Sequence, residues 1–137
     1  MILDDEALGW RFASGRRVAE SLRALAEDMG ATPLADYAWE VRDGEAVARH
    51  LRRVTPIGLI AVREDQPAPD GGAWSLRAQI VTLQQAVDIA IVRRESAGDS
   101  GFWELHVGDG NPRPVPDPEL PAAFALVRAA LEATARG

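Results

Sequence analysis

Residues 57–62 read Ile-Gly-Leu-Ile-Ala-Val, an apolar run without alternating polar side chains. Such a run is typical of a central strand that is covered on both faces of its sheet. Residues 74–83 alternate between apolar and polar positions instead, which predicts a long strand with Trp74 and Arg77 on opposite faces. Residues 63–72 are polar and rich in proline and glycine, so we expect a long loop between the two strands.

The N-terminal segment predicts a helix with one broad apolar face. That face contains Val18, Leu22, Leu25 and Met29. Asp4 or Asp5 can cap the start of the helix, and Gly30 is typical of a helix end. Ser14-Gly15 can kink the helix or split off a short leading turn. We also expect Trp10 to lie in the core.

Residues 37–42 alternate in polarity and predict a short strand, with Trp39 in the core. Asp43-Gly44 then turns the chain into a second, shorter helix that ends before Pro56. The buried stripe of this helix is expected to be Val47, Leu51 and Val54.

Two further strands are predicted at residues 86–94 and 102–107. Residues 108–118 contain many glycines and prolines, which predicts an extended arm or loop that contacts a neighbouring chain rather than the subunit core. Asp117-Pro118-Glu119 has the pattern of a helix start. The closing helix is expected to bury Phe124, Val127 and Leu131.

The 137 residues are enough for one domain, which we place at 1–137. The order of the expected elements predicts an α+β domain of two layers. In this domain a mostly antiparallel sheet of four to five strands is packed by the N-terminal and C-terminal helices.

The chain is acidic, with 15 Lys and Arg against 21 Asp and Glu and a formal net charge of −6. We therefore expect no specific nucleic-acid binding and no membrane partner, because both depend on attraction to phosphate. The absence of cysteine excludes disulfides, thiolate metal sites and cysteine nucleophiles. The acidic start and the lack of a long apolar stretch predict a protein that stays inside the cell that makes it.

No catalytic, cofactor-binding or metal-binding residues are predicted, and we expect no enzymatic activity. His50 and His106 lie on different elements and lack a neighbouring acid at ligand spacing. The acidic clusters fit helix capping and turns, and the glycine-rich pieces match no phosphate-binding motif.

The candidate functional residues are instead those of a subunit interface. Trp74 and Trp103 adjoin glycine-rich turns, where aromatic rings readily contribute to protein interfaces. The polar side of the strand at 74–83 suggests a sheet face that its own helices leave open. The interface candidates are Arg63, Asp70, Trp74, Arg77, Trp103 and Arg113.

Two blocks of the sequence resemble a known family. They read Thr55-Pro-Ile-Gly-Leu-Ile-Ala-Val-Arg-Glu-Asp-Gln-Pro-Ala-Pro and Leu83-Gln-Gln-Ala-Val-Asp-Ile-Ala-Ile-Val-Arg-Arg-Glu. With the helical start, they are similar to the Mu-like bacteriophage tail-terminator (tail completion) proteins over residues 5–135.

This resemblance implies a structural virion protein, made in the host cytoplasm and located at the head–tail junction of the tail. Its partners would be itself, as a homohexameric ring, the tail tube protein and the head–tail connector protein. The ring would cap the tail tube and let DNA pass without gripping it.

A second hypothesis remains open, that of a small acidic dimeric binding module or secretion-type chaperone. The mass in solution separates the two, since a ring supports the tail terminator and a firm dimer supports the binding module.

Overall fold

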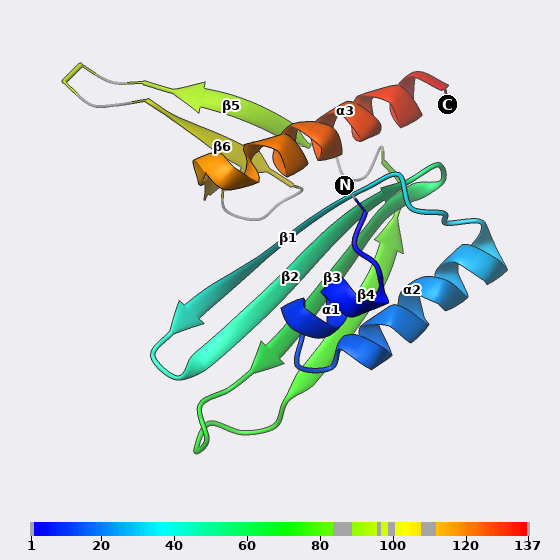
Figure 1. Cartoon of the computed structure of the whole chain (residues 1–137), viewed down its shortest axis with the longest axis vertical. Helices are drawn as coiled ribbons and strands as arrows, with labels where there is room; N and C mark the ends of the chain where they lie inside the picture. The colour runs from blue at the N-terminus through cyan, green and yellow to red at the C-terminus, as the bar shows by residue number, and fades with distance from the viewer. Residues whose placement is uncertain (1, 84–88, 96, 99–100, 108–111, 137) are drawn as a thin grey trace.

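The structure, a computed structural model, describes residues 2–83, 89–95, 97–98, 101–107 and 112–136. Its elements are α1 (Asp5–Arg11), α2 (Gly15–Met29), β1 (Ala35–Asp43), β2 (Ala46–Thr55), β3 (Gly58–Gln66), β4 (Ser75–Val81), β5 (Ala90–Arg94), β6 (Phe102–His106), β7 (Arg113–Val115), the 3₁₀ turn η1 (Asp117–Glu119) and α3 (Leu120–Arg136). The strands form two antiparallel sheets, in the orders β1-β2-β3-β4 and β5-β6-β7 (Figure 1). The predicted α+β class is confirmed, with the strands divided between two sheets.

The helix predicted after Asp43 is wrong, because residues 46–55 form strand β2. A two-residue loop led by Gly44, with a φ of +62°, joins β1 directly to β2 as a hairpin. Leu51 and Val54 have helical spacing but lie in different cores on opposite faces of the sheet. A strand that is buried on both faces can show the same spacing as an amphipathic helix, and pairing with β1 and β3 decides between them.

Helices α1 and α2 cover one face of the four-stranded sheet, which we call the helix face (Figure 1). The side chain of Asp4 caps α1 by accepting from the backbone N–H of Ala7 at 2.8 Å, and Gly30 ends α2 with a φ of +76°. Both helix ends are as predicted, and so is the division of the helix near Ser14. The core on this face contains Leu8, Phe12, Val18, Leu22, Ala38, Leu51, Ile60 and Val62.

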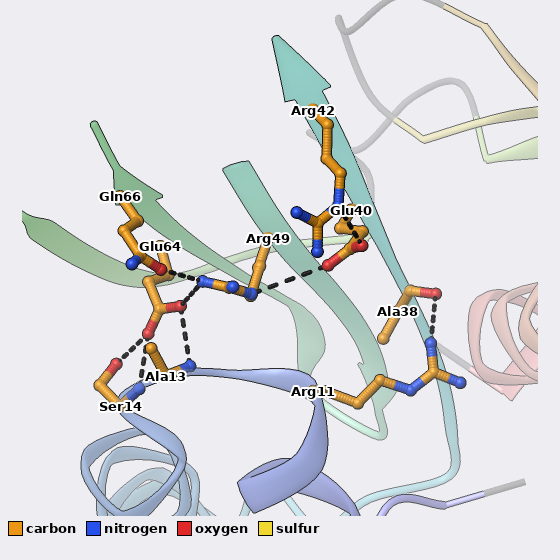
Figure 2. A network of polar contacts seen from close by, with 9 residues as sticks. All are labelled: Arg11, Ala13, Ser14, Ala38, Glu40, Arg42, Arg49, Glu64 and Gln66. Carbon is orange, nitrogen blue, oxygen red and sulfur yellow. Dashed lines mark hydrogen bonds and ion pairs between the residues drawn. The ribbon is translucent and has the colours of Figure 1, made fainter. Parts of the chain in front are cut away.

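A buried carboxylate ties the junction between α1 and α2 to the sheet. The side chain of Glu64 in β3 is fully buried and accepts from the backbone N–H groups of Ala13, at 3.0 Å, and Ser14, at 2.8 Å (Figure 2). The Ser14 hydroxyl and Arg49, at 2.9 Å, also donate to it. Burial alone would raise the pKa of Glu64, but these hydrogen bonds outweigh burial and lower the pKa.

A second buried ion pair lies beneath the N-terminal segment. Two guanidinium nitrogens of Arg53 in β2 each donate to Asp36 in β1 at 2.7 Å. Asp36 also accepts from the backbone N–H of Leu3 at 2.7 Å, so the pair fastens the start of the chain to the sheet.

Helix α3 and the three-stranded sheet pack together on one end of the opposite face. Residues 113–115 form β7, which pairs with β6, and Val115 is buried in this core. The predicted arm is therefore wrong over these residues, while residues 108–111 lie outside the described part of the chain. Proline is tolerated in β7 because an edge strand has one side without ladder hydrogen bonds.

Four apolar side chains that were expected in the core lie at the surface. Trp10 is 84% exposed, Met29 52%, Phe124 38% and Leu131 65%. The buried face of α3 consists of Ala123, Leu126, Val127 and Ala130. Of the three residues expected to be buried in α3, Val127 lies in this face, whereas Phe124 and Leu131 do not.

Candidate binding surface

The second face of the four-stranded sheet is covered at one end, where Ala35, Val54 and Leu59 pack in the core with α3. Beyond that end, the described part of the face carries side chains from all four strands. They are Trp39 and Val41 of β1, Ala48, His50 and Arg52 of β2, Ala61, Arg63 and Asp65 of β3, and Arg77 and Gln79 of β4. We call this set the arginine face.

Two arginines lie directly opposite each other on this face. Arg63 of β3 and Arg77 of β4 are register partners, and both are exposed. Arg63 forms a bidentate ion pair with Asp65 at 2.9 and 3.0 Å, whereas Arg77 donates to the neutral amide of Gln79 at 2.7 Å. Like charges directly opposite across strands are unfavourable. A negative group above Arg63 and Arg77 would relieve their repulsion.

Trp39 is held between a ring and two guanidinium groups. The imidazole of His50 stacks on Trp39 with the ring centroids 4.7 Å apart and an angle of 8° between the planes. Arg52 lies over the Trp39 ring at 5.1 Å, and Arg113 of β7 lies over it at 5.7 Å. Cation–π contacts of this kind hold the positive groups near an apolar surface.

His50 is neutral at neutral pH. Burial is the main reason that its pKa is lowered to about 4, and the positive charges of Arg52 and Arg63 contribute in the same direction, opposed by Asp65. Its Nδ1 atom is buried and has no hydrogen-bond partner among the described residues. The imidazole therefore acts here as a flat packing surface for Trp39 rather than as a charged group.

Arg113 is anchored where the second sheet meets the first. The Tyr37 hydroxyl donates to Glu119 at 2.6 Å and accepts from Arg113 at 3.2 Å. Burial, followed by the hydrogen bond to Glu119, raises the pKa of Tyr37 to about 12, so the phenol stays protonated. Arg113 also contacts Glu119 at 3.5 Å. This cluster fixes the arginine beside Trp39.

A pocket of about 300 Å³ opens next to Trp39 at the edge of β1. Trp10 and Arg11 of α1 line it from the helix side, and His50, Arg113 and Glu119 line it from the other side. Trp10 is the most exposed large apolar side chain of the described residues, at 84%. Aromatic and arginine side chains around one hollow are typical of a protein contact site.

The structure brings three of the six interface candidates to the same side of the four-stranded sheet. Arg63 and Arg77 lie on the arginine face, and Arg113 contacts Trp39 at its β1 end. Asp70 lies in the exposed β3–β4 loop. The other two candidates lie elsewhere.

Trp74 packs beneath Arg17 of α2 at 5.5 Å, on the helix side of the molecule. Trp103 meets Phe124 edge-on at 5.3 Å in the second sheet. Glu64, the neighbour of Arg63 in β3, is fully buried beneath α1 and α2, so its charge cannot serve a subunit contact.

Sequence reasoning missed Trp39 and His50 as members of this surface. The sequence predicts Trp39 in the core, against which the ring packs partly buried, and the helix expected after Asp43 contains His50. Reading residues 46–55 as a strand would have placed His50 opposite Trp39 and next to Arg63, because cross-strand partners share a face.

Chemically, this arrangement suits the binding of negatively charged groups. Among the described residues, no group of three His, Cys, Asp or Glu side chains is placed to hold a metal ion. None of the helices in that part of the chain has both the length and the apolar character to cross a membrane. Comparison with family models, curated proteins and solved structures gave no match.

Proposed function

We propose that this chain is a binding protein without enzymatic activity, and that its arginine face takes an acidic segment of a partner protein. The observation that carries this proposal is the direct opposition of Arg63 and Arg77 on an exposed face of a chain with a net charge of −6. Two adjacent positive groups in an acidic protein attract a carboxylate-rich segment locally, while the net charge repels nucleic acid.

The edge of the face supports a peptide rather than a small anion. Trp39, Arg52 and Arg113 combine an aromatic surface with positive charge beside the pocket, so apolar and acidic side chains of one segment can bind together. Aromatic and arginine residues contribute most of the binding energy in many protein interfaces.

The test is fluorescence anisotropy with a labelled poly-glutamate peptide and, separately, a labelled DNA duplex. We expect the peptide to bind and its affinity to fall with added salt. The Arg63→Gln/Arg77→Gln double variant should lose most of this affinity. Arg16→Gln is the matched control, because Arg16 is 93% exposed on α2 and away from the face.

Peptide binding that is equally strong in the double variant, or absent in the wild type, would overturn the proposal. Tight binding of duplex DNA at physiological salt would overturn it as well, because the partner class would then be a nucleic acid.

A tail-terminator ring is a second candidate function, and one observation favours it. Arg77 meets no carboxylate among the described residues, while the Asp5 and Glu6 side chains of α1 are exposed on the other side of the sheet. A head-to-tail contact between these unlike patches of successive copies would close into a ring if the rotation allowed it. Light scattering at increasing protein concentration tests for a hexamer, and Arg77→Glu should then block assembly.

A further inference from the structure

Strand β1 forms one edge of the four-stranded sheet (Figure 1). Arg11 donates to the carbonyl oxygen of Ala38 at 3.4 Å, so the backbone groups of Ala38 point away from β2 (Figure 2). Residues of an antiparallel strand alternate in the side to which they direct N–H and C=O. Glu40 and Arg42 therefore also present their backbone groups at the free edge, where another strand can pair.

We propose that a second copy of this chain pairs with β1 in antiparallel fashion, across a two-fold axis at Val41. The two sheets then become one continuous sheet. A two-fold contact requires a self-complementary surface. In this register Glu40 lies opposite the partner's Arg42, and Arg42 lies opposite the partner's Glu40, which gives two cross-strand pairs of opposite charge.

Charge also excludes the neighbouring registers. If the two-fold axis moves by one residue to Glu40, Glu40 lies opposite the partner's Glu40. If it moves by one residue to Arg42, Arg42 lies opposite the partner's Arg42. Like charges at directly opposed positions are unfavourable. The register at Val41 avoids both conflicts and brings together two apolar side chains, each 50% exposed in the single chain.

The β1–β2 turn extends the same contact into the pocket beside Trp39. In the proposed register the partner's Asp43 lies opposite Trp39, and the partner's Glu45 follows it. Asp43 and Glu45 are exposed, and neither forms an ion pair within the described residues. The pocket is lined by Arg11 and Arg113 together with Glu40 and Glu119. Arg11 meets no carboxylate among the described residues, so it is the group with which the partner's acidic turn can pair.

This contact does not use Arg63 and Arg77, which carry the proposed function, although the partner's turn shares the pocket beside Trp39 with the proposed peptide site. A two-fold axis through the paired edges leaves both arginine faces on the same side of the continuous sheet. The dimer would therefore present two binding faces side by side to a partner.

Disulfide trapping tests the register directly, since the chain contains no cysteine. The Val41 pair occupies a non-hydrogen-bonded position, where Cα atoms are about 4.5 Å apart and a disulfide fits. Val41→Cys should form a cross-linked dimer at least about tenfold faster than Ile57→Cys, because thiols held at the axis react at a high effective concentration. Ile57 is the matched control, an apolar residue 45% exposed in the β2–β3 turn.

A charge exchange tests the pairing without cysteine, with the mass read by sedimentation equilibrium. Wild-type protein should sediment as a dimer, and Glu40→Arg or Arg42→Glu should shift it to monomer. The double variant Glu40→Arg/Arg42→Glu should restore the dimer. A monomeric wild type, equal cross-linking rates for Val41→Cys and Ile57→Cys, or a larger assembly insensitive to Glu40→Arg would each overturn the proposal.

Discussion

Arg63 and Glu64 are neighbours in β3, but their side chains lie on opposite faces of the sheet, and one is exposed while the other is buried. Glu64 is fully buried on the helix face, where three residues donate hydrogen bonds to it. Arg63 is 56% exposed on the arginine face and lies opposite Arg77. A step of one residue along a strand thus separates a charge that holds the fold together from an exposed charge whose ion pair, with Asp65, lies at the surface.

The contrast has an energetic reason. A buried charge that loses its partners keeps its desolvation penalty, so its removal costs several kcal/mol. An exposed charge remains solvated, and its ion pairs contribute little to stability. Changes on the helix face should therefore reduce folding stability, and changes on the arginine face should reduce binding.

The largest effect is expected from Glu64→Gln. The amide nitrogen of glutamine cannot accept hydrogen bonds, and Arg49 loses its buried counter-charge. We expect the free energy of unfolding to fall by about 3–5 kcal/mol, measured by urea denaturation. A loss below 1 kcal/mol would show that the network does not hold α1 and α2 on the sheet.

A smaller loss is expected where the two N-terminal helices meet. A Cβ at Gly15 would lie 2.5 Å from the Cα of Gly9 and 2.6 Å from the carbonyl oxygen of Leu8. Gly15→Ala should therefore lower the free energy of unfolding by about 1–3 kcal/mol. Gly9→Ala is the control, because its Cβ meets nothing within 4 Å, and it should stabilise α1 by about 0.5–1 kcal/mol.

The arginine face should contribute a pH dependence through His50. Its pKa is about 4 in the folded protein, against an ordinary value of 6.5. Between these two pH values the unfolded chain binds the proton and the folded chain does not. The contribution of His50 to the free energy of unfolding is therefore complete above pH 6.5 and is lost as the pH falls toward 4. His50→Phe keeps a ring on Trp39 and should flatten this slope in denaturation curves. An unchanged slope would contradict the lowered pKa.

The smallest change in stability is expected from Arg77→Glu. An exposed substitution should alter the free energy of unfolding by no more than about 0.5 kcal/mol. Removal of the repulsion with Arg63 favours a slight gain. The same variant should lose binding to poly-glutamate in the anisotropy assay. A large loss of stability would show that Arg77 supports the fold. It would then contradict the proposal that the arginine face serves binding and the helix face serves folding.

The candidate site was only partly predictable. Alternation along residues 74–83 placed Arg77 on the face opposite Leu76, and the structure shows the same arrangement. Trp39 and His50 were missed because the helix expected after Asp43 removed β2 from the sheet. Without β2, nothing in the sequence indicates that these two rings lie side by side.

By itself, the sequence determined the α+β class, the antiparallel strands and the ends of the first helical segment. These features depend on neighbours in the chain: Asp4 caps the adjacent turn, and Gly30 accepts a positive φ. Only the tertiary structure decided that residues 46–55 are a strand, that residues 113–115 are a strand and that Glu64 is buried. Each of these depends on distant partners, because a strand gains its hydrogen bonds and a buried charge its counter-charges from residues far away in the chain.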